Sequence, residues 1–151
     1  MINDFSKAMT NPERSCGAVV FTWKKGVPYY VIVQEMAGAY SFPKGHMEGQ
    51  ENEEETARRE VFEETGTHPA FLAGFLQEDE YDLAEKPGVR KRVTYYLAEL
   101  QDETPVPRPG EIRRIQLLPY EEALTCFEHE NTRRILTAAH DFLISSERGN
   151  P

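Results

Sequence analysis

The chain contains 151 residues, of which 26 are acidic and 17 are basic, so that its formal net charge is −9. This length suits one domain with a core of ordinary size. Because nucleic acid binding normally needs a basic surface, the negative charge argues against nucleic acid as a partner. It leaves room for a small phosphate-rich ligand, since a bound divalent cation reverses the local charge.

The sequence shows neither a membrane span nor an export signal. No apolar run approaches the roughly 18 residues that a spanning helix needs. Residues 1–13 lack the apolar segment after basic residues that marks a secretory signal. The two cysteines, Cys16 and Cys126, are far apart and form no metal or redox motif. We therefore expect reduced thiols and a cytoplasmic protein, and a monomer rather than a dimer.

One domain is expected over residues 14–147, preceded by a loose arm at 1–13 and followed by a tail at 148–151. Apolar, β-prone runs bounded by turn residues predict strands at 15–23, 29–34, 70–80, 91–100 and 112–118. Helices are predicted at 51–66, 119–127 and 131–144. The last helix places five apolar residues on one face at helical spacing: Ile135, Leu136, Ala139, Phe142 and Leu143. This order predicts an α/β fold in which helices cover a mixed sheet.

The chain is organised around residues 45–66. A glycine-containing loop leads into a strongly helix-forming run from Glu51, and Gly66 is placed to end that helix. Eight glutamates lie between positions 48 and 64. Two of them, Glu63 and Glu64, stand in the last turn, where the helix dipole disfavours negative charge. Their position indicates a purpose beyond forming a helix.

The spacing of three glutamates indicates a metal site. Glu60, Glu63 and Glu64 stand at i, i+3 and i+4, so their carboxylates share one helix face. Like charges so close repel one another unless a cation lies among them. Clustered oxygen ligands suit Mg²⁺ or Mn²⁺, with water and phosphate oxygens completing the coordination. The alternative is a solvated acidic face, which is what most runs of charge are.

Arg59 has a different expected role. It follows Glu51 by eight residues, a little over two helical turns, and is predicted to pair with it. Such a pair would brace the loop against the helix while the arginine points away from the three carboxylates. We therefore expect support for catalysis from Arg59 and no direct chemistry.

The spacing as a whole resembles a known motif. The pattern G-x5-E-x7-R-E-U-x-E-E-x-G, in which U is aliphatic, matches from Gly45 to Gly66. It is similar to the Nudix box, the signature of the Nudix hydrolases. Two positions depart from the usual motif: Thr67 replaces an aliphatic residue, and Gly49 is separated from Glu51 by Gln50. Neither departure touches a proposed metal ligand.

The resemblance extends over residues 15–145, which look like the asymmetric diadenosine tetraphosphate hydrolase branch of the family. Local features carry it: the segment 42–46 (Phe-Pro-Lys-Gly-His), Tyr81, the lysine-containing strand at 91–97, Glu111, and Ala-His-Asp-Phe-Leu at 139–143. The branch implies an α/β/α sandwich with a mixed sheet between helices. It also implies Mg²⁺-dependent hydrolysis of a nucleoside polyphosphate, with diadenosine tetraphosphate split asymmetrically into ATP and AMP.

Roles for individual residues follow from the resemblance. It implies metal ligation by Glu60 and Glu64, with Glu63 as a third carboxylate and the Gly45 carbonyl as a backbone ligand. The general base is one of three carboxylates, in the order Glu63, Glu60, Glu111, because family members differ in this residue. Coordination to a metal ion strongly lowers the pKa of a bound water, so the reaction needs little further help from a general base.

Three residues are candidates to contact phosphate: Lys44, Lys91 and His46. The alternative for the lysines is a solvated surface position, and for the histidine a hydrogen-bonded place in a loop. Adenine recognition calls for aromatic faces, since stacking is worth about 1–3 kcal/mol per base. Tyr81 is the first candidate, and Phe127 and Tyr40 follow, with ordinary packing as their alternative. His68, His129 and His140 show no ligand spacing and are assigned no role.

Proteins with a Nudix box could also have other functions. An RNA 5′-end pyrophosphohydrolase would need a basic groove, for which Lys91, Arg92, Arg113 and Arg114 are the available residues. A hydrolase of oxidised nucleoside triphosphates is also compatible, whereas one of diphosphoinositol phosphates would want more basic residues. A catalytically silent nucleotide-binding module should have lost box carboxylates, and all three are present.

Overall fold

The computed structural model describes residues 13–83 and 86–148. The predicted arm and tail lie outside these ranges, except that Glu13 begins the first strand and Arg148 ends the last helix. Within them, the strands are β1 (Glu13–Lys24), β2 (Val27–Glu35), β3 (Tyr40–Ser41), β4 (Lys44–His46), β5 (Ala70–Phe71), β6 (Gln77–Asp82), β7 (Arg90–Glu99) and β8 (Ile112–Pro119). The helices are α2 (Glu53–Thr65), α3 (Tyr120–Cys126) and α4 (Glu130–Arg148).

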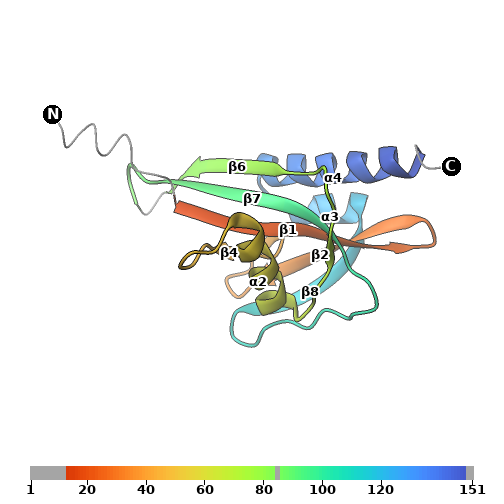
Figure 1. The fold of residues 1–151 in the computed structure, drawn as a ribbon, viewed down its shortest axis with the longest axis horizontal. Coiled ribbons are helices and arrows are strands. Elements are labelled where there is room, and N and C mark those ends of the chain that lie inside the picture. The colour runs from red at the N-terminus through yellow and green to blue at the C-terminus, as the bar shows by residue number, and fades with distance from the viewer. Residues whose placement is uncertain (1–12, 84–85, 149–151) are drawn as a thin grey trace.

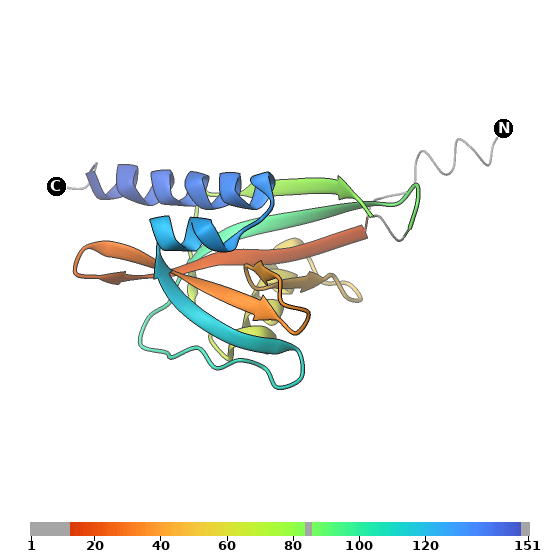
Figure 2. The same cartoon turned by 180° about the vertical axis from the view of Figure 1, so that it is seen from behind.

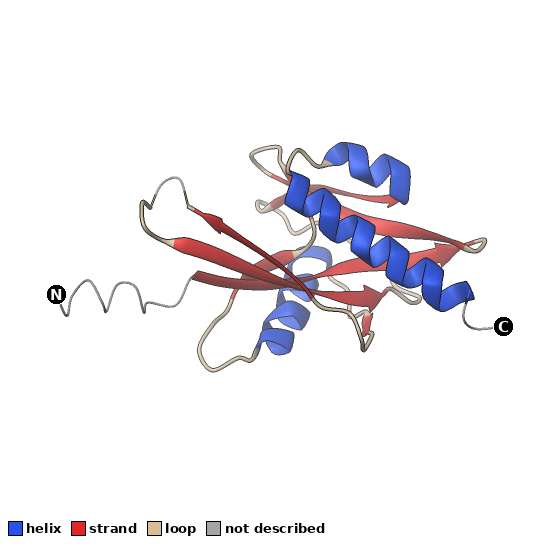
Figure 3. Cartoon of the chain, turned by 90° about the horizontal axis from the view of Figure 1, so that it is seen from above, coloured by secondary structure: helices blue, strands red, loops and turns tan. Residues whose placement is uncertain are grey.

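The strands form one mixed sheet, whose main order is β3-β2-β1-β7-β5. β1 and β7 run parallel, and the other pairs are antiparallel. Helices α3 and α4 cover one face of this sheet and α2 covers the other, as the three views show (Figure 1, Figure 2, Figure 3). The structure therefore confirms the predicted α/β/α sandwich.

Each face of the sheet has its own core. The larger cluster packs the sheet against α3 and α4, and its buried residues include Phe21, Phe42, Leu97, Ile135 and Leu136. The smaller cluster packs Val61 of α2 against β1, β2 and β7. The predicted apolar face of the last helix is confirmed, since four of its five residues are buried and Phe142 is partly buried.

The single strand predicted at 70–80 is wrong, because the segment forms two strands, β5 and β6, separated by residues 72–76. Gly74 interrupts it with a φ of 92°, a left-handed conformation that glycine adopts readily. The short strands β3 and β4 were also missed, since two or three residues are too few to show a period.

The pairing of β1 with β4 positions the functional loop. Gly17 lies opposite Lys44, and Cys16 opposite Gly45. The backbone approaches so closely that a Cβ at position 17 would overlap with the Pro43 carbonyl oxygen and with Lys44. The Ala18 N–H donates to that same carbonyl over 3.2 Å. This contact places Gly45 directly beside α2.

Candidate active site

Helix α2 begins and ends at residues with strong capping geometry. The Asn52 side chain accepts from the Glu55 N–H over 2.8 Å, and Glu55 accepts in return from the Asn52 N–H over 2.8 Å. This reciprocal pair is a capping box. Gly66 adopts a φ of 71° and its N–H bonds to the Phe62 carbonyl. The predicted end at Gly66 is confirmed, and the helix proper starts two residues later than Glu51.

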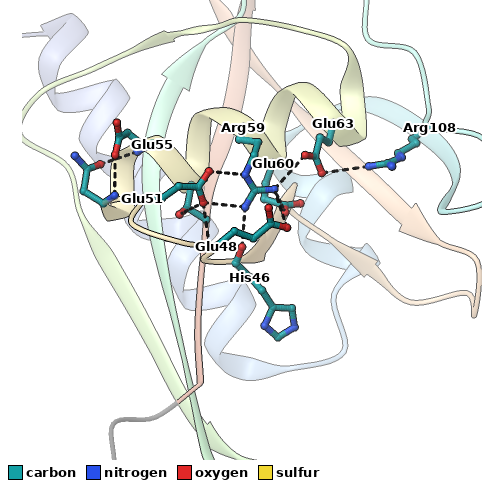
Figure 4. A network of polar contacts seen from close by, with 10 residues as sticks. His46, Glu48, Glu51, Glu55, Arg59, Glu60, Glu63 and Arg108 are labelled. Atoms are coloured by element: carbon teal, nitrogen blue, oxygen red, sulfur yellow. Dashed lines mark hydrogen bonds and ion pairs between the residues drawn. The ribbon is translucent and has the colours of Figure 1, made fainter.

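Arg59 braces the loop against the helix, as its spacing predicted (Figure 4). Its Nε lies 2.6 Å from Glu51 Oε2 and its Nη2 lies 3.0 Å from Glu51 Oε1. The same Nη2 donates to the His46 carbonyl over 2.8 Å. These bonds to Arg59 lower the pKa of Glu51 to about 2.

Arg59 also contacts the carboxylates that it was expected to avoid, and that part of the prediction is wrong. Its Nη1 lies 2.7 Å from Glu60 Oε2 and 3.1 Å from Glu63 Oε2. The guanidinium has one edge for the loop and another for the helix, because its five donors form a flat fork. It thereby supplies a cation between Glu60 and Glu63.

Glu60 and Glu64 form the buried part of the carboxylate cluster, each 7% exposed. Burial raises the pKa of both groups, and it raises that of Glu64 to about 8, with the neighbouring Glu60 adding to the shift. The Lys44 backbone N–H donates to Glu64 Oε1 over 3.4 Å. Two adjacent acids in a poorly solvated place are costly to ionise without a cation.

Gly45 completes the wall opposite these two acids. A Cβ at this position would overlap with the Glu60 carboxyl group, so the backbone and the carboxylate are in direct contact. This arrangement brings the Gly45 backbone close to the Glu60 side chain, as a shared metal site would require. The candidate metal ligands here are all oxygen atoms, which suits a hard cation such as Mg²⁺.

Glu63 is held apart from this pair. Its carboxylate is half-exposed and lies between Arg59 Nη1 and Arg108 Nη1, the latter at 3.2 Å (Figure 4). Among the described residues, no group of three histidine, cysteine or acidic side chains is drawn together closely enough to hold a metal. The predicted convergence of three helix carboxylates is therefore absent in this arrangement, because the two arginines draw Glu63 aside.

A cleft of about 490 Å³ opens over the buried acids. It brings together most of the residues predicted for metal, base and phosphate: Glu60, Glu64, Gly45, Glu111, Lys44, His46 and Lys91. Glu111 reaches it from the loop before β8, and its charge contributes to the raised pKa of Glu60 and Glu64. Residues from four separate segments thus meet at one place.

A second pocket of about 480 Å³ adjoins the cleft and shares Glu35, Ser41 and Lys44 with it. Tyr40 and Tyr81, both predicted to stack on a base, line this pocket. Arg114 Nη2 donates to the Tyr40 hydroxyl over 2.8 Å, which fixes the position of that ring. An aromatic pocket therefore lies beside the acidic cleft.

Several residues of the second pocket were missed by the sequence reasoning. Buried Asp79 on β6 accepts a hydrogen bond of 2.8 Å from the Asn131 amide, and both line the pocket together with His129. The sequence offered one signal for Asp79 as a pocket residue, namely an acidic side chain at a strand position that faces inward. Asn131 and His129 lie about fifty residues away in sequence, and no local pattern connects them to it.

Phe127 does not line either pocket. It is 4% exposed and belongs to the larger core, with its ring 5.0 Å from that of Phe42. The stacking role predicted for Phe127 is therefore contradicted, and its packing alternative holds. His140, assigned no role, packs between Tyr30 and Tyr120.

The fold and the carboxylate cleft define a Nudix hydrolase. The NUDIX domain model matches residues 11–139, and the chain belongs to this family, whose members hydrolyse phosphoanhydride bonds and generally use divalent metal ions. Among curated proteins, the chain is 32% identical over 146 residues to the asymmetrical bis(5′-nucleosyl)-tetraphosphatase of Rattus norvegicus. That match covers 88% of this chain and 97% of the rat protein. The Mus musculus enzyme of the same name is 31% identical over 145 residues.

Solved structures agree with this assignment at the level of the fold. A Caenorhabditis elegans Ap4A hydrolase in a binary complex matches with a TM-score of 0.81 at 21% identity, over 88% of this chain and 98% of that one. The NUDIX domain of Shewanella oneidensis NrtR, in complex with ADP ribose, matches with a TM-score of 0.70 at 16% identity, over 91% and 92%. Among the described residues, no helix has both the length and the apolar character to cross a membrane.

Proposed function

We propose that this protein hydrolyses diadenosine tetraphosphate asymmetrically to ATP and AMP in a reaction that requires Mg²⁺, with Mn²⁺ as a substitute. The observation that carries the proposal is the shared wall between the acidic cleft and the aromatic pocket. A phosphate chain and a nucleobase need those two environments side by side. The relatives named as asymmetrical tetraphosphatases, matched over 97% of the rat protein, support this substrate.

Glu60 and Glu64, with the Gly45 carbonyl, are the residues we propose to hold the metal. Their oxygen-only chemistry and their burial support this choice, since a divalent cation would relieve two desolvated charges. Glu63 joins them only if Arg59 and Arg108 release it. A cation bound here neutralises phosphate oxygens and makes a coordinated water more acidic.

The remaining cleft residues bind and orient the substrate. Lys44, Lys91 and His46 line the cleft, which supports assigning them as donors to phosphate oxygens that approach the acids. In the second pocket, Tyr40 and Tyr81 present aromatic surface to a base. Lys44 lines both spaces, so we assign it the phosphate nearest the nucleoside. Holding the reacting phosphorus beside the water supplies much of the rate enhancement in such reactions.

For the general base, the geometry supports Glu111 ahead of Glu63 and Glu60. Glu63 pairs with two arginines and does not line the cleft, and Glu60 is better placed as a ligand. Glu111 lines the cleft and remains about half-exposed, so it can exchange a proton with solvent. A carboxylate within reach of the attacking water is what proton removal requires.

The test is product analysis in Mg²⁺ and ¹⁸O-labelled water, with dinucleoside polyphosphates, nucleoside triphosphates and 5′-capped or triphosphorylated RNA. We expect ATP and AMP from diadenosine tetraphosphate, with label in one product only, and far lower rates with the other substrates. Formation of two ADP molecules, or preference for RNA or a nucleoside triphosphate, would refute the substrate. Cytoplasmic location and a monomeric state remain predictions.

A further inference from the structure

Loop 101–111 runs along the carboxyl end of α2 and contacts both the helix and the segment that follows it. The contacts join Glu103 to the backbone of His68 at 2.6 Å, Val106 to the carbonyl of Thr65 at 2.8 Å, and Arg108 to Glu63 at 3.2 Å. The third contact lies closest to the cleft. The loop therefore delivers the residues that follow Arg108 to the active site.

Arg108 holds two carboxylates with different nitrogens of one guanidinium. Its Nη1 lies 3.2 Å from Glu63 Oε1, and its Nε lies 3.3 Å from Glu111 Oε2. A tight turn supports the second contact, since the Ile112 N–H donates to the Arg108 carbonyl over 2.9 Å and Gly110 adopts a φ of 80°. Figure 4 shows Arg108 reaching Glu63 from outside the helix.

We propose that Arg108, which lies outside the Nudix box, is a positioning residue that holds the Glu111 carboxylate over the cleft by joining it to Glu63 of α2. The inference rests on the proposed function, in which Glu111 acts on the attacking water. Arg108 does not line the cleft itself, so it acts through Glu111. Without it, a half-exposed carboxylate on a loop would be free to take other rotamers.

The two effects of removing Arg108 differ in size. Both of its ion pairs are nearly half-exposed, and such pairs contribute little to stability because water screens them. Catalysis is far more sensitive, since displacing a reacting group by about 1 Å can cost on the order of a hundredfold in rate. We therefore expect a kinetic defect in a protein that remains folded.

The experiment is a double-mutant cycle of Arg108→Ala with Glu111→Gln, followed by kcat, KM and thermal unfolding. Arg108→Ala alone should lower kcat roughly ten- to a hundredfold, while KM changes by less than about twofold. In the Glu111→Gln background the same substitution should have almost no further effect, because the two residues act as one unit. Arg113→Ala, an exposed arginine on β8, is the matched control and should leave both constants unchanged.

A full-sized loss of kcat in the Glu111→Gln background would overturn the proposal. So would a defect confined to KM, which would make Arg108 a substrate contact. Hydrogen exchange supplies a readout that needs no substrate: the Val106 amide should exchange faster in Arg108→Ala than in wild type or Arg113→Ala. If the wild type cleaves no diadenosine tetraphosphate, the proposed function fails while the exchange result still decides whether Arg108 secures the loop.

Discussion

Gly45 and the carboxyl group of Glu60 are in direct contact, with no space between them for even one additional carbon atom. The backbone of β4 and a buried side chain of α2 thus define each other's positions. The contact depends on the close pairing of β1 with β4, where Gly17 makes a similar approach to Pro43.

The Gly45→Ala variant tests whether this contact sets the metal site. The new methyl group would displace the Glu60 carboxylate, which sits at the far end of a flexible side chain, so the fold should survive. We expect weaker Mn²⁺ binding, measured by titration calorimetry, and a rate lower by about tenfold or more. Normal binding and rate would show that Glu60 is not a ligand in its present orientation.

Glu64→Gln separates function from stability. The substitution keeps the shape of a side chain that is 7% exposed and removes its ionisable carboxyl group. Turnover should fall by orders of magnitude, because Glu64 is a proposed carboxylate ligand of the metal. In the absence of metal and near neutral pH, thermal unfolding should occur at the same temperature as in wild type or higher, since the raised pKa of the buried Glu64 carboxyl group lowers the stability of the wild-type fold. A mild effect on turnover would mean that the metal lies elsewhere.

Tyr81→Ala should mainly raise KM for the dinucleotide. Tyr81 is 37% exposed and lines the second pocket, so its removal costs stacking rather than core packing. Stacking on one base is worth about 1–3 kcal/mol, which predicts a rise of roughly fivefold or more. Tyr81→Phe keeps the ring and serves as the control. Equal KM values for wild type and Tyr81→Ala would eliminate the stacking assignment.

The packing of His140 predicts a loss of stability in mild acid. Its ring stacks on Tyr120 at 4.1 Å, and its Nδ1 lies 2.9 Å from the Tyr30 hydroxyl. Burial lowers the pKa of His140 below 6.5, although nearby Asp141 opposes the shift. Above about pH 6.5 the ring is neutral in both states, and as the pH falls the unfolded chain takes up a proton first. The folded state therefore loses stability as the pH drops from about 6.5 towards the lowered pKa, and the loss levels off once the pH is below it.

Denaturant unfolding at pH 7.5 and pH 5.5 measures this effect. Wild type should lose more stability between these two values than His140→Gln, which cannot protonate. The comparison isolates the histidine, because the acidic residues elsewhere contribute equally to both proteins. An identical pH dependence would show that His140 titrates normally in the folded state.

Features of this protein that depend on residues close in sequence could be predicted, and those that depend on distant residues could not. Helix α2 and its glycine cap were foreseen because both depend on neighbours within one turn. The Arg59–Glu51 brace was also foreseen, since helical geometry places residues eight apart on nearby turns. The second role of Arg59 was not, because spacing does not show how a five-donor group divides itself among several acids.

Long-range contacts account for what was missed. Asp79 meets Asn131 only because α4 starts over β6, and Arg108 meets Glu63 only because the proline-rich loop after β7 passes the end of α2. The position of Phe127 could not be predicted for the same reason, because it depends on a contact with a residue far away in sequence. An aromatic residue near a helix junction is equally compatible with a base pocket and with a core, and its ring contact with Phe42 decides the matter.

The parallel pairing of β1 with β7 joins segments nearly eighty residues apart, and Glu111 follows β7 in sequence. A chain growing from the ribosome therefore carries the whole proposed metal-binding motif well before it contains Glu111, the residue proposed to activate water. Fragments that end before Glu111 should be unable to attack a nucleotide, whatever cation they bind.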